Sequence, residues 1–214
     1  MNQTTKRLTV CAMLAAAAYV VMAIGRIPVV LFLSYDPKDI IIAIGGFLYG
    51  PLSAMGISVV VSLLEMVTVS GTGFIGCIMN ILSTCSFVCV ASYLYRKKRT
   101  PMGAFMGLLV GCLVMTGVML LWNYLITPLY MGYPREAVAA LLLPAFLPFN
   151  LLKGGLNAAG TFLLYRPLSG ALQKSGLVPR EESTNKGHFV GIALVAALLL
   201  ATCILLVLAM QGVI

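Results

Sequence analysis

The sequence predicts an all-α membrane protein, a polytopic helix bundle with a six-helix core and a seventh, C-terminal transmembrane helix. Two features of the composition indicate this fold: 61% of the 214 residues are hydrophobic and only 9% are charged. Soluble domains carry about 25% charged residues, and one membrane-spanning helix needs about 20 apolar residues. The apolar segments therefore account for six or seven spans, and the lipid bilayer is the expected environment of the chain.

The first span is predicted from Leu8 to Ile24, after a basic start at Lys6 and Arg7. A cleavable signal peptide is the alternative, but the apolar run has no clear A-x-A site followed by a polar exit, so we expect a retained helix. Ala12 and Ala16 lie four residues apart and therefore share one face, where a second helix can approach closely. Ordinary packing within the chain is the other interpretation of these alanines.

Residues 26–38 are predicted to form a loop with an apolar middle, Ile27 to Leu33. This middle part can dip back into the membrane interface or cap a cavity. At the end of the loop, Tyr35 and Asp36 either cap a turn or face a ligand. Asp39 then opens the next helix, where a carboxylate interacts favourably with the helix dipole.

The second and third spans are predicted from Ile40 to Gly50 and from Pro51 to Val69. Proline is favoured at the first helical position, so Pro51 marks a helix start. The second span is only about 17 Å long at 1.5 Å per residue. A span this short leaves room for a polar cavity near the membrane surface, and Glu65 lies near the far end of the third span.

The next three spans are predicted from Phe74 to Tyr95, from Met102 to Ile126 and from Val138 to Tyr165. Pro144 and Pro148 interrupt the start of the last of these, because proline lacks the N–H of the helical ladder and clashes with the preceding turn. We therefore expect a broken helix at this point.

The chain divides into three predicted parts. Residues 1–172 form the six-helix core, 173–188 form a polar cytoplasmic linker, and 189–214 contain the extra transmembrane helix. The linker holds His188, the single histidine, without nearby residues that could complete a metal site. The last span, Phe189 to Met210, has no ionisable group.

Basic residues determine the expected orientation. With seven spans, most of the 14 lysines and arginines fall on one side, including Lys6, Arg7 and the cluster Arg96–Arg99. The positive-inside rule then places the N-terminus in the cytoplasm and the C-terminus outside the cell membrane. The net charge of +8 follows from the same rule and does not indicate a nucleic-acid partner.

Polar residues within the spans converge at one depth. A lysine buried in lipid costs roughly 2.5–3.5 kcal/mol on insertion scales, so such a residue usually faces a polar cavity or a partner. Counted at about 1.5 Å per residue, five polar side chains lie in the outer half of the membrane. A single Asn in a span more often makes an interhelical hydrogen bond than a ligand contact, and Glu65 can pair with Lys153. The five residues are Glu65, Asn80, Asn123, Asn150 and Lys153.

Several classes of function are excluded by the motifs. The six cysteines lie in apolar segments without a C-x-x-C pair, so neither a disulfide nor a metal site is expected. Catalytic and nucleotide-binding motifs are missing from the sequence, which argues against an enzyme or an ATPase. The chain is therefore a facilitator, an ion-coupled carrier with Glu65 as its one candidate carboxylate, or a subunit energised by partners.

Three segments, together with Glu65, resemble a known family. They are Ser34–Ile40 (S-Y-D-P-K-D-I), Gly45–Leu52 (G-G-F-L-Y-G-P-L) and Pro148–Gly154 (P-F-N-L-L-K-G). Over about residues 6–172 the chain looks like the riboflavin-specific substrate-binding (S) component of energy-coupling factor (ECF) transporters. The family's helices end near position 172, so the seventh span is a departure from its pattern.

The resemblance implies a six-helix fold that captures riboflavin from outside the cell. Two ATP-binding subunits would then drive uptake by tilting the S component through a shared transmembrane (T) component. Riboflavin is the transported substrate, no cofactor is expected, and FMN or FAD can share the fit. A solitary facilitator and an S component for a different vitamin are the alternative functions.

The resemblance also implies roles for particular residues. Asn150 and Lys153 would hydrogen-bond the polar edge of the isoalloxazine ring, Asn123 would add a contact, and residues 27–38 would form the lid. Ala12 and Ala16 match the A-x-x-x-A motif that docks on the T component. The predicted substrate-binding residues are Tyr35, Asp36, Glu65, Asn80, Asn123, Asn150 and Lys153.

Overall fold

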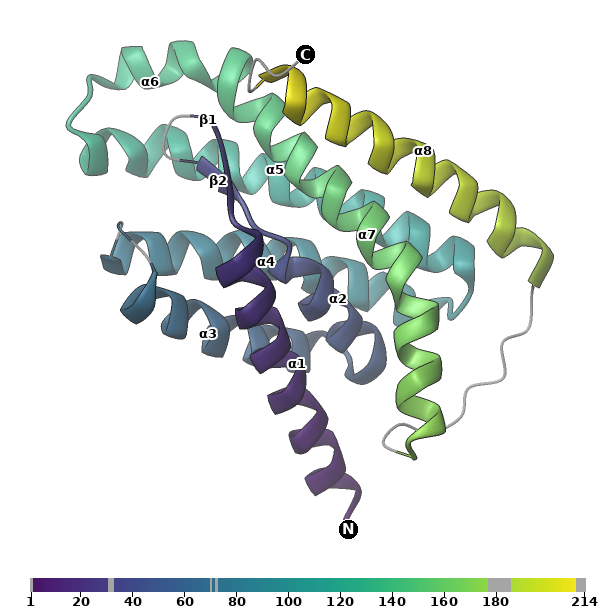
Figure 1. Cartoon of the computed structure of the whole chain (residues 1–214). Helices are drawn as coiled ribbons and strands as arrows, with labels where there is room; N and C mark the ends of the chain where they lie inside the picture. Colours follow the sequence, from purple (N-terminus) through teal and green to yellow (C-terminus); the bar gives the residue numbers. More distant parts are fainter. Residues whose placement is uncertain (1, 31–32, 70, 72, 177–185, 211–214) are drawn as a thin grey trace.

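The computed structural model describes residues 2–30, 33–69, 71, 73–176 and 186–210. It is a bundle of helices with one small hairpin (Figure 1). In chain order the elements are α1 (Gln3–Gly25), β1 (Ile27–Val30), β2 (Leu33–Tyr35), α2 (Lys38–Tyr49), α3 (Pro51–Thr68), α4 (Gly73–Lys97), α5 (Pro101–Met131), α6 (Arg135–Leu141), the π-helical turn η1 (Leu142–Phe146), α7 (Leu147–Lys174) and α8 (Lys186–Met210).

The multi-pass membrane fold is confirmed by the lengths of the helices. The helix α2 has 12 residues and is therefore, as predicted, short compared with a hydrocarbon core of about 30 Å. In α8 the described apolar stretch is Val190–Leu206, so a crossing by α8 stays a prediction. Five segments are long and apolar enough to cross: Gln3–Gly25, Pro51–Thr68, Gly73–Lys97, Pro101–Leu129 and Arg135–Lys174.

The predicted end of span five at Ile126 is wrong, because α5 continues to Met131. Pro128 lies inside the helix, where it removes one backbone donor. The helix ends within a turn of this proline, so the loss affects only one position. Gly132 then adopts a left-handed conformation (φ 67°) and its N–H bonds to the carbonyl of Pro128, which caps the helix.

The predicted break before Asn150 takes the form of a π-helical turn. The prolines at 144 and 148 lie in η1 and in the first turn of α7, and the chain stays helical from Arg135 to Lys174. A π turn inserts one extra residue into the helix and often occurs at functional sites. Here it precedes the segment that carries Asn150 and Lys153.

An antiparallel hairpin, β1–β2, replaces the loop predicted after the first span. Ile27 pairs with Tyr35 and Pro28 pairs with Ser34, with an irregularity in register before Val30. Below we call β1–β2 the hairpin. Leu33 on the hairpin packs against Phe146 and Phe149, so this short sheet covers the region of the π turn.

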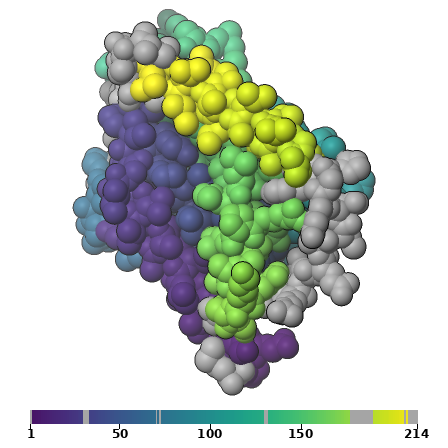
Figure 2. Space-filling model, turned by 45° about the vertical axis from the view of Figure 1, so that its right-hand side comes forward, coloured from purple at the N-terminus to yellow at the C-terminus, as the bar shows by residue number. Residues whose placement is uncertain are grey.

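The helix α8 lies along α7 and α5, and its contacts reach the hairpin strand β1 (Figures 1 and 2). A close approach between α7 and α8 occurs at Gly155, where an added Cβ would lie 3.1 Å from the Sγ of Cys203. Leu152, Leu156 and Cys203 form a small cluster with Tyr35 of the hairpin. The extra helix therefore packs on the bundle at the level of the hairpin.

Candidate ligand-binding site

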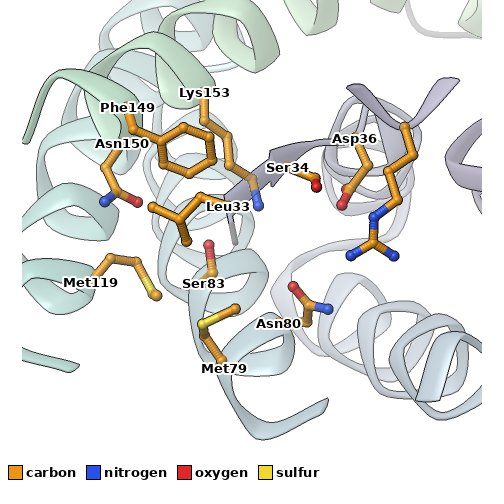
Figure 3. A pocket seen from close by; sticks show the side chains of 11 residues that line it. Leu33, Ser34, Asp36, Met79, Asn80, Ser83, Met119, Phe149, Asn150 and Lys153 are labelled. Atoms are coloured by element: carbon orange, nitrogen blue, oxygen red, sulfur yellow. The ribbon is translucent and has the colours of Figure 1, made fainter. Parts of the chain in front are cut away.

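A cavity of about 40 Å³ lies beneath the hairpin, between α4, α5 and α7. Figure 3 shows Phe149 and Lys153 on one side of it, Met79 and Asn80 on the other, and the hairpin between them. Its wall consists of Arg26, Leu33, Ser34, Asp36, Met79, Asn80, Ser83, Met119, Phe149, Asn150 and Lys153.

The wall combines apolar and polar side chains in a way that suits a flat ligand with polar edges. Leu33, Met79, Met119 and Phe149 supply apolar surface from the hairpin and three helices. The other lining residues supply hydroxyl, amide and charged groups. Small-molecule sites typically have this composition, in which apolar contacts give area and a few polar groups fix orientation.

Lys153 lies on α7 and pairs with Asp39, not with Glu65. Its Nζ is 3.8 Å from Oδ2 of Asp39, which is 1% exposed. The carboxylate of Asp39 also accepts hydrogen bonds from Thr84 Oγ1 (2.7 Å) and Asn157 Nδ2 (3.1 Å). Because a buried charge needs a partner, this pair explains how a lysine persists inside the bundle. Asp39 and Lys153 are called the cavity pair below.

Glu65 takes part in a second group of charges at the base of the hairpin. Its carboxylate lies 3.3 Å from Nη1 of Arg26 and accepts a hydrogen bond from the fully buried Lys38. The Nζ of Lys38 is also 3.7 Å from Oδ1 of Asp36. These four residues, the hairpin cluster, join α3 to the chain on both sides of the hairpin. Among the described residues, Glu65 does not line the cavity.

The asparagines predicted for the site differ in what they face. Asn80 and Asn150 both line the cavity, and Asn150 Nδ2 donates to the carbonyl of Phe146 at the π turn (2.8 Å). Asn123 is fully buried within α5, where its Nδ2 donates to the carbonyl of Met119 (2.7 Å) and its Oδ1 accepts from Thr127 (2.9 Å). Asn123 therefore lies one turn from the cavity wall.

Tyr35 packs with Leu152, Leu156 and Cys203, on the side of the hairpin that faces α7 and α8. Burial, with smaller effects from Asp39 and Asp36, raises the pKa of its phenol, so the hydroxyl stays neutral near pH 7. Asp36, its neighbour, lines the cavity. On α1, Ala12 and Ala16 are both exposed, whereas Ala15 and Ala18 are buried.

Several lining residues were missed in the sequence. Ser83 follows Asn80 at helical spacing and Phe149 precedes Asn150, so both were close to recognised polar positions. Lys38 was expected at the end of a loop and Asp39 at the start of a helix, whereas both are buried. The remaining missed residues were Arg26, Leu33, Ser34, Met79 and Met119.

A membrane-embedded helix bundle with a small amphipathic cavity defines a substrate-binding membrane protein. Residues 6–165 match the model of the family described as the ECF transporter substrate-specific component, and the chain belongs to this family. The family is a transporter component and not an enzyme. Both predictions, the family and the absence of an enzymatic role, are confirmed by this match.

Known proteins agree with the family. The chain is 30% identical over 181 residues to the riboflavin transporter RibU of Staphylococcus aureus (strain TCH60), covering 80% of this chain and 95% of that protein. It is 28% identical over 163 residues to the riboflavin transporter FmnP of Bacillus subtilis (strain 168), covering 70% and 84%.

A solved structure of the S component of a bacterial ECF transporter has the same fold. It superposes with a TM-score of 0.69 at 28% identity, covering 79% of this chain and 99% of that chain. The family match ends at residue 165, so α8 lies outside it. The six-helix arrangement is therefore shared with the family, and α8 is an addition.

Proposed function

We propose that this protein captures riboflavin from outside the cell and delivers it for ATP-driven uptake, as the substrate-specific subunit of an ECF-type transporter. The observation that carries the proposal is the cavity under the hairpin, where Asn150 and Lys153 face apolar side chains. Relatives named as riboflavin transporters support the choice of ligand.

The isoalloxazine ring is flat and apolar, with two carbonyls and an imide N–H along one edge. Lys153 donates to a ring carbonyl, and the amide of Asn150 pairs with the same edge. Leu33 and Phe149 cover a face of the ring. The ribityl hydroxyls then lie among the polar residues at the other end of the wall, which are Arg26, Ser34, Asp36, Asn80 and Ser83.

The cavity of about 40 Å³ holds water but not a flavin. Drug-sized ligands occupy about 300–1,000 Å³. The cavity is therefore smaller than a flavin, and in this proposal the hairpin moves away from Phe149 when riboflavin binds.

Uptake needs a T component and two ATP-binding subunits in this proposal. Ala12 and Ala16 form an exposed small-residue surface on α1, which suits close approach of a helix of the T component. The helix α8 packs mainly on α7 and α5, so it leaves this surface accessible. The N-terminus lies in the cytoplasm and the C-terminus outside the cell membrane, in agreement with the positions of the basic residues.

The test is to purify the full chain from cells grown with riboflavin and to look for a bound yellow, fluorescent flavin. We expect bound riboflavin, and titration with FMN and FAD will rank the flavins. A colourless protein that binds no flavin would contradict the proposal and leave an S component for another vitamin. Uptake that needs no T component or ATP-binding subunits would instead identify a solitary facilitator.

A further inference from the structure

Asp39 is buried next to the cavity but does not line it. It lies in the first turn of α2, and its side chain is held between α4 and α7. A buried carboxylate is costly unless its oxygens are paired. Three groups on two neighbouring helices meet this need: Thr84, Asn157 and Lys153.

The three contacts are not equal. Thr84 and Asn157 donate direct hydrogen bonds of 2.7 and 3.1 Å, one to each oxygen. The ammonium of Lys153 is 3.8 Å away, which is longer than the roughly 2.7–2.9 Å of a direct charge-assisted hydrogen bond. The neutral donors therefore fix the carboxylate, while Lys153 is attracted to it and keeps its N–H groups for another acceptor.

The spacing of residues on α7 explains how the carboxylate of Asp39 can contact both Asn157 and Lys153. Lys153 and Asn157 are four residues apart and share a face of the helix. Asn157 is fully buried against Asp39, whereas Lys153, one turn nearer the hairpin, also lines the cavity. Asp39 thus lies behind the ammonium, on the side away from the ligand.

We propose that Asp39 is a positioning residue for flavin binding: held by Thr84 and Asn157, it keeps the Lys153 ammonium directed into the cavity. The inference rests on the proposed function, because it assigns Lys153 to the ring edge of riboflavin. If the carboxylate of Asp39 is removed, the ammonium of Lys153 loses the buried charge that attracts it. Asp39 then acts on affinity only through Lys153.

The experiment is a double-mutant cycle on the purified full chain, with riboflavin affinity measured by quenching of flavin fluorescence. Asp39→Asn keeps the shape of the side chain and removes its charge. We expect it to weaken binding about tenfold, the size of a charged hydrogen bond. In a Lys153→Ala background the same substitution should change affinity less than about twofold, because coupled residues are not additive.

A control substitution at another buried polar residue separates a positioning role of Asp39 from a general loss of packing. Ser62→Ala is the matched control, since Ser62 is buried on α3 and its hydroxyl has no hydrogen-bond partner among the described residues. It should leave the affinity unchanged. If Asp39→Asn does not fold, Thr84→Val decides, because it loosens the carboxylate and keeps both charges. We expect Thr84→Val to weaken binding about threefold, and only when Lys153 is present.

Equal losses from Asp39→Asn, or from Thr84→Val, with and without Lys153 would overturn the proposal and make Asp39 a purely structural residue. Unchanged affinity in Asp39→Asn would overturn it as well. Failure of the wild-type chain to bind riboflavin is a different result, since it contradicts the proposed function itself.

Discussion

The hairpin cluster and the cavity pair contain the same kinds of charges but differ in how closely the carboxylate and the lysine ammonium are paired. In the hairpin cluster, Glu65 is 1% exposed and both of its oxygens are in contact with cations. In the cavity pair, the ammonium of Lys153 is 3.8 Å from the carboxylate of Asp39, and Lys153 lines the cavity. Glu65 therefore joins α3 to the base of the hairpin, whereas in our proposal Lys153 keeps donors for a ligand. Five substitutions test this difference.

The largest effect should come from Glu65→Gln. The substitution leaves the fully buried Lys38 with Asp36, 3.7 Å away, as its remaining ion-pair partner among the described residues, and breaking a buried ion pair costs about 3–5 kcal/mol. We expect a marked fall in the melting temperature of the purified protein. Glu136→Gln is the control, because Glu136 is exposed on α6. Equal melting temperatures for the two variants would show that the hairpin cluster does not stabilise the fold.

Lys153→Ala should reduce ligand affinity more than stability, in contrast to Glu65→Gln. We expect riboflavin affinity to fall by about 10–100-fold, from the loss of a charged hydrogen bond. The melting temperature should fall less than for Glu65→Gln, because Asp39 keeps its bonds to Thr84 and Asn157. Fluorescence titration and a melting curve measure both quantities, and unchanged affinity would remove Lys153 from the site.

The substitutions Asn150→Ala and Asn123→Ala compare a residue of the cavity wall with a residue buried within α5. Asn150 lines the cavity, so its loss should weaken binding about tenfold. Asn123 bonds only within α5, as described, so its loss should lower stability by about 1–2 kcal/mol and leave affinity nearly unchanged. Equal effects of the two substitutions on affinity would mean that Asn123 also contacts the ligand.

The smallest effect should come from Arg26→Gln. Its side chain is 28% exposed, and partly exposed ion pairs contribute about 0–1 kcal/mol. The melting temperature should therefore change far less than in Glu65→Gln. A fall as large as that of Glu65→Gln would show that Arg26, and not Lys38, is the main partner of the carboxylate.

The sequence was sufficient for the all-α membrane fold, because the length of the apolar segments determines it. The depth of the polar residues in the membrane stays a prediction. Depth alone does not say which way a side chain points. Asn123 and Asn150 were both expected in the outer half of the membrane, and each donates to the carbonyl four residues before it, yet of the two it is Asn150 that lines the cavity. The rotation of each helix about its axis depends on packing with its neighbours, which no single segment contains.

Contacts between residues far apart in the sequence could not be predicted either. Asp39 and Lys153 lie on α2 and α7, and their contact depends on how the short helix α2 packs on α7 and α4. The pairing of Glu65 with Lys38 instead of Lys153 has the same origin. The hairpin was missed because four- and three-residue strands carry too short a pattern to distinguish from a loop.

The small size of the cavity has a consequence for how tightly the protein can hold its substrate. A ligand that binds only an open form has its affinity reduced by the fraction of molecules that are open. Each 1.4 kcal/mol by which the closed form is favoured weakens apparent affinity about tenfold. The contact of Leu33 with Phe149 and the charges that Glu65 holds at the base of the hairpin contribute to that difference. In our proposal Glu65, which does not line the cavity, thereby affects the substrate concentration at which the site is filled.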